Sequence, residues 1–488
     1  MKTILLLIFA LATCLALASA SNVPLPPTPP PPPDAKPLDT KATVLDTLDP
    51  DCIEDTLTLS PDSKRLAYVA RRGDKAVIFL DSKPSKPYDL SDPIVNTLVF
   101  SPDSKRFAYT AAVKGKEFAV IDGIEGKPYD AVIDLAFSPD SSRTAYAAQR
   151  WDKWLFVIDG RETQPYDDIA EDNPIFSPDS KHVVYSAAIN DKWLLVVNGI
   201  EVPSFDFPRD PNTTRYEYVG IPTFSPDSKR FACVVDDGKL GSYVLTNDGQ
   251  GKEYLVIGDP GFSPDSKHLF YIATTNDNHN VLLVDHKALA TYDHDNTTAL
   301  YSPDTSRFAC AAHKNDKLVI LLDGKEQTLD ADVLEVQDIA FSPDSKHFAA
   351  LIESTDGQYI LLDGVKQKSH NIIYSFAFSP DSNHVACIVS DGRWCVTLDG
   401  VEGPKYDAIY LPSLTFSPDS KHLAYVASYL HEYFLVLDNH QSLPCSNYLF
   451  NPITFTAPDT CSLAIPRRTS TGQTQVIVLQ ASAPGQNP

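Results

Sequence analysis

The chain has 488 residues, of which 43% are hydrophobic, and its formal net charge is −23, with 64 acidic side chains against 41 basic ones. A chain of this length has more residues than one hydrophobic core usually serves. It therefore holds several domains, or a repeat in which each unit buries its neighbours' faces. The excess of acid repels phosphate backbones and anionic lipid surfaces, and it excludes nucleic acid as an expected partner.

Residues 1–20 have the pattern of a secretory signal peptide. A positive start at Lys2 precedes an apolar stretch over 4–18, and Ala18-Ser19-Ala20 offers small residues for cleavage before Ser21. We therefore expect an exported protein, periplasmic or secreted. Two alternatives remain open: a lipoprotein signal ending at Cys14, and an uncleaved anchor. No later segment could cross a bilayer, so the mature chain has no transmembrane segment.

Residues 21–40 form a proline-rich linker that we expect to be disordered. The stretch Val23–Pro37 reads VPLPPTPPPPPDAKP. Such a segment is stiff and extended, and we expect that it cannot join a sheet. We interpret it as a spacer, with a ligand for a proline-binding module as the alternative.

Residues 41–480 consist of one short repeat. The tripeptide Ser-Pro-Asp occurs ten times, with its serine at 60, 101, 138, 177, 225, 263, 302, 342, 379 and 417, and Ala457-Pro458-Asp459 is a degenerate eleventh copy. Most intervals are 37 to 41 residues and one is 48. A period in this range indicates propeller blades or a solenoid. Residues 481–488 are expected to be a disordered tail.

One repeat, Asp338 to Gly364, predicts its own strands. A short apolar strand over 339–341 is followed by Ser-Pro-Asp-Ser, which suits a type I turn. Strands over 347–351 and 359–362 come next, and Asp363-Gly364 favours a tight hairpin into a fourth strand. The third strand is apolar at nearly every position in most copies, as expected for a strand covered on both faces. The sequence therefore predicts an all-β fold, a β-propeller of about eleven four-stranded repeats.

The repeat resembles a known family. The runs Phe100–Tyr109 and Phe416–Tyr425 read Phe-Ser-Pro-Asp-Ser-Lys-Arg/His-hydrophobic-Ala-Tyr, and Asp122–Asp130 supplies the return segment. These runs are similar to the WD-repeat-like propeller repeat of TolB-type exported proteins, and the similarity covers nearly all of residues 50–480. The resemblance implies a propeller and a binding role, and it carries no fixed catalytic set.

The number of copies leaves the ring count open. Eleven copies form one unusually wide ring or two smaller rings, and the even spacing favours one ring. The 48-residue interval after Phe176 is the best candidate for a break. The last copy ends after its third strand, near Leu479, and the segment Ala42–Leu48 could supply the missing fourth strand and hide the open edges.

The cysteines fall into two groups. Cys233, Cys310 and Cys387 occupy one slot of the repeat where other copies carry tyrosine, so we interpret them as small packing residues. Cys445 and Cys461 flank the last repeat and could pair, and Cys52 could also reach them if the ring closes. A two-residue turn at Asp391-Gly392 would place Cys387 and Cys395 on opposite faces of a hairpin.

The seventh residue of the motif is basic or imidazole in all ten good copies. We term these residues the polar ring: Arg65, Arg106, Arg143, His182, Arg230, His268, Arg307, His347, His384 and His422. We expect a structural role, in which each pairs with its own motif aspartate, such as Asp62 or Asp344. The functional alternative is an anion-binding or pH-sensing ring, since half of its members are histidine.

Aromatic residues gather in the third to fifth repeats. Trp151, Trp154 and Trp193 lie at turns between second and third strands, and a long interval holds Phe205, Phe207, Tyr216 and Tyr218. Both kinds of loop emerge on one face of a propeller. We expect Trp154 and Trp193 to pack between blades. Trp151, Phe205, Phe207, Tyr216 and Tyr218 form the candidate binding rim.

No catalytic or metal-binding signature is present. Gly-x-Ser-x-Gly, His-Glu-x-x-His, calcium-loop and phosphate-loop motifs are missing. Asp277, His279, Asp293, His294 and Asp295 are plausible cation ligands, but their spacing fits no recognised site. We expect no cofactor, no metal and no catalytic residues.

The sequence favours a non-enzymatic binding scaffold that engages a protein or glycan through one rim. The alternatives are an enzyme of hydrolase or lyase type, with a loop-built site at the central channel, and a structural component without a discrete ligand.

Overall fold

The structure is a computed structural model that describes residues 36–483, apart from 91–96, 171–173, 191, 202–218, 237–240, 294–296, 316, 411–412, 443, 445–452 and 470–472. These residues all belong to one compact unit, Pro32–Pro488. They form strands and turns and contain no α-helix, and so no helix with the length and apolar character needed to cross a membrane. The predicted signal peptide lies outside the described residues, as do most of the predicted linker and tail.

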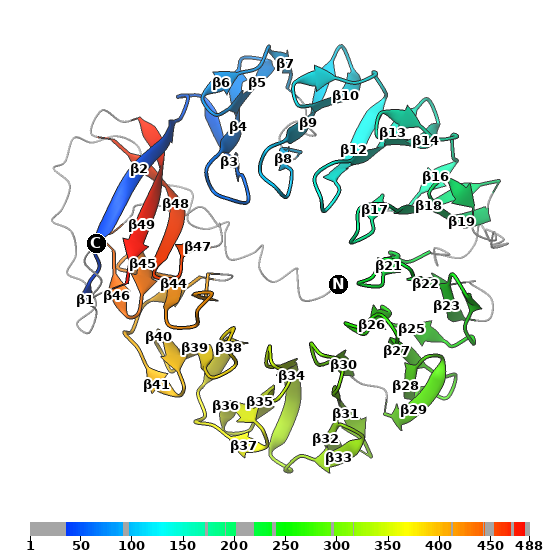
Figure 1. Cartoon of the computed structure of the whole chain (residues 1–488), viewed down its shortest axis with the longest axis vertical. Coiled ribbons are helices and arrows are strands. Elements are labelled where there is room, and N and C mark those ends of the chain that lie inside the picture. The colour runs from blue at the N-terminus through cyan, green and yellow to red at the C-terminus, as the bar shows by residue number, and fades with distance from the viewer. Residues whose placement is uncertain are drawn as a thin grey trace. The chain divides into compact units, whose positions relative to one another are not determined.

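The strands form eleven sheets, here called blades and numbered along the chain (Figure 1). The first six are blade 1, with β3 (Cys52–Leu59), β4 (Leu66–Arg72), β5 (Lys75–Leu80), β6 (Lys83–Pro84) and β7 (Tyr88–Asp89); blade 2, with β8 (Val99–Phe100), β9 (Phe107–Val113), β10 (Lys116–Ile121) and β11 (Ile124–Glu125); blade 3, with β12 (Ala131–Phe137), β13 (Thr144–Arg150), β14 (Lys153–Ile158) and β15 (Arg161–Glu162); blade 4, with β16 (Asp168–Ile169), β17 (Ile175–Phe176), β18 (Val183–Ile189), β19 (Lys192–Val197) and β20 (Ile200–Glu201); blade 5, with β21 (Thr223–Phe224), β22 (Phe231–Asp236), β23 (Ser242–Thr246) and β24 (Gly249–Gln250); and blade 6, with β25 (Val256–Ile257), β26 (Gly261–Phe262), β27 (Leu269–Thr274), β28 (Asn280–Val284) and β29 (Lys287–Tyr292).

The remaining five blades include the two strands that come first in the chain. They are blade 7, with β30 (Thr298–Tyr301), β31 (Phe308–Lys314), β32 (Lys317–Leu322) and β33 (Lys325–Thr328); blade 8, with β34 (Val333–Phe341), β35 (Phe348–Ser354), β36 (Gly357–Leu362) and β37 (Val365–Lys366); blade 9, with β38 (Ile372–Phe378), β39 (Val385–Ser390), β40 (Trp394–Leu398) and β41 (Val401–Glu402); blade 10, with β42 (Ala408–Ile409), β43 (Thr415–Phe416), β44 (Leu423–Tyr429), β45 (Glu432–Leu437), β46 (His440–Gln441) and β1 (Lys36–Pro37); and blade 11, with β47 (Thr454–Ala457), β48 (Thr460–Arg468), β49 (Thr474–Ser482) and β2 (Thr40–Thr47).

The blades close into a single ring, as Figure 1 shows. Eleven clusters of buried apolar residues hold it together, and each cluster combines side chains from two consecutive blades. The last of these interfaces packs Ala464 and Val476 of blade 11 against Leu66 and Tyr68 of blade 1. The predicted propeller and the preferred single ring are confirmed, and the alternative of two rings is excluded.

The first long strand of the chain completes the last blade. β2 pairs antiparallel with β49, where Thr43 lies opposite Val478. The predicted closing segment, Ala42–Leu48, is confirmed with a shift of one or two residues. The prediction that the proline-rich segment cannot join a sheet is wrong at its end, because Lys36–Pro37 form β1, in which Lys36 lies opposite His440 in a parallel pair with β46. The two N-terminal strands are thus both paired with the last two blades of the chain. This pairing covers strand edges that would otherwise be open.

The turns within a blade define two faces of the ring. The Ser-Pro-Asp-Ser turn joins the first and second strands, and its backbone bond from Ser345 N–H to the Ser342 carbonyl measures 2.8 Å. The Asp363-Gly364 turn joins the third and fourth strands with φ of +48° and +80°, as predicted for a tight hairpin. We call the side that carries these two turns the motif face. The opposite side, which carries the turns between second and third strands and the connections between blades, is the loop face.

The cysteine prediction for blade 9 is wrong. The turn holds three residues, Asp391, Gly392 and Arg393, because Ser390 pairs with Trp394. This register places Cys395 opposite Val389, so Cys387 and Cys395 share one face. Both thiols are free, and both are buried.

The other cysteines pack as small core residues. Cys233 and Cys310 are buried, as the slot they share with Cys387 predicts. Cys461 is a buried free thiol, Cys52 is a half-buried free thiol, and the predicted partner Cys445 lies outside the described residues.

Candidate functional site

On the motif face, each Ser-Pro-Asp-Ser turn is built around a buried hydroxyl. In blade 8, Ser342 is fully buried. Its Oγ donates to Asp344 Oδ1 at 2.7 Å and accepts the backbone N–H of His347 at 2.9 Å. The second carboxylate bond comes from the backbone N–H of Lys346 at 3.1 Å. The motif aspartate is therefore engaged within its own turn.

The polar ring does not pair with the motif aspartate, so that prediction is wrong. Arg65 Nε donates to Asp81 Oδ2 at 2.9 Å, and His347 Nδ1 lies 2.7 Å from Asp363 Oδ2. The hairpin aspartate takes this role because its turn lies beside the motif turn, whereas the motif carboxylate is already occupied. The ring residues face the following hairpin residues in chain order: Asp81, Asp122, Asp159, Asn198, Asp248, Asp285, Asp323, Asp363, Asp399 and Asp438.

The arginines of the polar ring also bind the next blade. Arg307 Nη1 donates to the Lys346 carbonyl at 2.6 Å, and its guanidinium lies 5.1 Å from the centre of the Phe341 ring. The Arg65, Arg106, Arg143 and Arg230 guanidinium groups stack in the same way on the next blade's phenylalanine. The structure thus gives the ring a role in joining blades. Anion binding or pH sensing by the ring stays a prediction.

On the loop face, Trp151 is 81% exposed. It occupies the turn between β13 and β14 with a left-handed φ of +58°. Its backbone N–H donates to Asp130 Oδ2 at 2.6 Å. The Lys116 ammonium beside Asp130, together with this N–H, lowers the pKa of that carboxyl. The turn is therefore fixed while the indole projects into solvent.

The remaining predicted aromatics divide into two groups. Trp154 packs against the buried cluster between blades 3 and 4, and Trp193 packs against the cluster between blades 4 and 5. The prediction that these two pack between blades is confirmed. Phe205, Phe207, Tyr216 and Tyr218 lie outside the described residues.

Two groups of side chains resemble cation ligands. His279 Nδ1 lies 3.1 Å from the Asp277 carbonyl within one turn, and His294 and Asp295 are outside the described residues. In blade 9, the ligand atoms of His370, Asp391 and Glu402 lie within 4.8 Å of one another. Glu402 already accepts the ammonium groups of Lys368 and Lys405, which lower its pKa to about 2 and would repel a cation.

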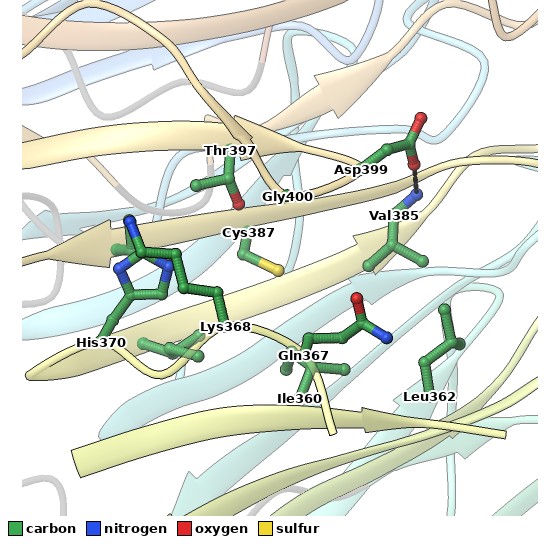
Figure 2. Close-up of a pocket in the computed structure, with 12 residues that line it drawn as sticks. Ile360, Leu362, Gln367, Lys368, His370, Val385, Cys387, Thr397, Asp399 and Gly400 are labelled. Atoms are coloured by element: carbon green, nitrogen blue, oxygen red, sulfur yellow. Dashed lines mark hydrogen bonds between the residues drawn. The ribbon is translucent and has the colours of Figure 1, made fainter. Parts of the chain in front are cut away.

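A cavity of about 150 Å³ lies between blades 8 and 9 (Figure 2). Figure 2 shows Lys368 and His370 at one end, Cys387 in the middle, and Leu362 and Val385 at the other end. His370 is buried, and its Nδ1 lies 2.9 Å from Asp391 Oδ2. Sequence analysis missed this site, although His370 stands where most other repeats place tyrosine.

Residues 365–396 match a protein-family model described as "WD domain, G-beta repeat". The matched segment runs from β37 of blade 8 through β40 of blade 9. The chain is a WD-repeat-like β-propeller. No curated protein gives a significant match to this propeller. Among solved structures, the propeller aligns with one titled "Crystal structure of the eukaryotic initiation factor" at 12% identity and a TM-score of 0.39, over 70% of this chain and 98% of that chain. A similarity at this level carries no argument about function.

Proposed function

We propose that this propeller is a non-enzymatic binding scaffold that engages a protein or glycan through its loop face, with Trp151 as the anchor. One observation carries the proposal: a tryptophan that is 81% exposed stands at a left-handed turn position. The same turn position holds Gly73, Lys114, Asn190, Asn315 and Leu430 in five other blades, all with positive φ. Glycine and asparagine are the residues that such a backbone favours.

Folding gives no reason for tryptophan at this position. A side chain in the left-handed region costs about 1–2 kcal/mol relative to a right-handed backbone. Exposure of the indole adds apolar surface in contact with water. The bond from the Trp151 N–H to Asp130 holds the turn, so little conformational freedom remains to be lost on binding. An exposed indole on a fixed turn is suited to be an anchor, because tryptophan is enriched among the residues that dominate binding energy.

The proposed location is outside the cytoplasm, periplasmic or secreted. This part of the proposal rests on the signal-like pattern of residues 1–20 and on the resemblance of the repeat to TolB-type exported proteins.

The experiment compares capture by the wild-type propeller and by Trp151→Asn from envelope and secreted fractions of the host. Asparagine suits the turn, so the variant should fold with an unchanged or higher Tm. We expect binding of the captured partner, measured by titration calorimetry, to weaken about thirtyfold, as for an anchor residue worth about 2 kcal/mol. Protease treatment of the fractions separates a protein partner from a glycan.

Leu430→Asn is the matched control. Leu430 occupies the same turn position in blade 10 with φ of +51°, and its N–H donates to Asp407 Oδ2 at 2.8 Å. This control should leave partner binding unchanged. Equal affinity of wild type and Trp151→Asn for the captured partner would contradict the proposal.

A further inference from the structure

Five interfaces between blades contain a pair of tyrosines that the interface of blades 8 and 9 lacks: Tyr88 with Tyr109, Tyr129 with Tyr146, Tyr166 with Tyr185, Tyr254 with Tyr271, and Tyr406 with Tyr425. One tyrosine comes from the connection between blades and the other from the second strand of the next blade. At the interface of blades 3 and 4, the Tyr166 and Tyr185 hydroxyl oxygens are 3.1 Å apart. At the interface of blades 2 and 3, the ring centres of Tyr129 and Tyr146 are 6.5 Å apart. These rings fill the space between neighbouring sheets.

In blade 9 both positions carry smaller side chains. His370 takes the connection position and Cys387 takes the strand position. The cavity of about 150 Å³ lies at these two residues. In blade 8 the same positions carry Leu329 and Ala350, which pack in the apolar cluster between blades 7 and 8. Blade 9 therefore lacks both tyrosine rings and carries a buried imidazole at one of the two positions.

The polar partners of the missing tyrosine are still present. In blade 3, Tyr129 donates its hydroxyl to Glu162 Oε1 at 2.8 Å, and Lys127 binds the same oxygen at 3.0 Å. The equivalent pair in blade 9 is Glu402 and Lys368, whose charged atoms are 2.5 Å apart. A ring nitrogen of His370 lies within 4.8 Å of a Glu402 oxygen. Lys368 and His370 line this end of the cavity, so a hydroxyl here would meet the polar side chains that surround Glu402.

We propose that this cavity binds a small single-ring phenol. Its ring would occupy the space between Ile360 of blade 8 and Val385 of blade 9, beside the Cys387 thiol, in place of the absent tyrosine rings. Its hydroxyl would lie at the end of the cavity that Lys368 and His370 line, where the His370 imidazole offers a hydrogen bond. An apolar cavity of about 150 Å³ holds one benzene ring. The site lies between blades and is separate from the proposed Trp151 surface, so the two proposals fail independently.

The test titrates the full-length chain with phenol and with toluene, a matched ring without the hydroxyl. We expect phenol to raise the Tm in a saturable way. Toluene should bind at least tenfold more weakly, because the hydrogen bond of the hydroxyl at the end lined by Lys368 and His370 is lost. N-acetyltyrosinamide, in a parallel arm, separates a free phenol from a tyrosine side chain on a partner chain. Equal stabilisation by toluene and phenol would overturn the phenol assignment.

Cys387→Tyr introduces the residue that six other blades carry at this position, and it should abolish the phenol effect. Cys310→Tyr makes the same change in blade 7, beside Tyr292, and should retain it. A crystal soaked with 4-bromophenol gives a readout that needs no variant. The bromine signal should lie between blades 8 and 9, and its absence there, or a phenol effect unchanged in Cys387→Tyr, would refute the site.

Discussion

At the scale of single residues, the motif aspartates carry charge that is hydrogen-bonded only in the folded chain. Asp140 is held by the Ser138 hydroxyl and by the backbone N–H of Ser142, which lower its pKa to about 2. An aspartate in an unfolded chain titrates near about 3.9. Because the folded pKa is the lower one, the carboxylate contributes stability above about pH 4 and loses it as the pH falls towards 2.

We therefore predict that Asp140→Asn lowers the Tm at neutral pH by an amount that shrinks between about pH 4 and 2. Asparagine keeps one acceptor oxygen but lacks the charge that the Ser138 and Ser142 donors favour. Thermal unfolding of wild type and variant across this pH range checks the prediction. A difference in Tm that stays constant, or grows as the solution is acidified, would contradict it.

At the scale of the element, the Ser-Pro-Asp-Ser turn both closes a hairpin and joins it to the next blade. The Asp304 backbone N–H donates to Ser345 Oγ of the following blade at 3.0 Å. Nine such bonds run in sequence from blade 1 to blade 10, with Thr305 replacing serine once. The left-handed φ of Ser345, +66°, sets the hydroxyl at this position. The repeated motif is therefore an interface device as well as a turn.

Ser342→Ala should destabilise the propeller by about 1–3 kcal/mol, because it leaves the backbone N–H of His347 without its buried partner. The denaturation midpoint in urea measures the effect. Ser306→Ala is the control, since that exposed hydroxyl binds only Asp304 at the surface. A midpoint shift no larger than that of the control would show that the buried hydroxyl contributes nothing.

Turns were predictable where they depend on local residues. Proline and the Asp-Gly pair specify the two turns of the motif face, and both are observed. The partner of the polar ring was not predictable in this way, because Asp363 reaches His347 only through the hairpin that separates them by 16 residues. The prediction that Cys387 and Cys395 lie on opposite faces of the hairpin failed for a related reason. Arg393 belongs to the turn, and this one extra residue reverses the side of the sheet on which Cys395 lies.

At the scale of the whole molecule, the period, the single ring and its closure by β2 were predicted from the repeat. Trp151 was predicted as a contact residue because its turn stands apart from the buried strands. The cavity was not predicted, since its volume depends on side chains from two blades. The sequence nevertheless contained an indication of it, because His370 and Cys387 both stand at repeat positions where most other repeats carry tyrosine.

The most direct test of the central claim, one ring of eleven blades closed by β2, is electron cryomicroscopy of the full-length chain. We predict class averages with eleven blades in one ring, and a map in which β2 is the outer strand beside β49. Two smaller rings per chain, a different number of blades, or a last blade without β2 would contradict the account.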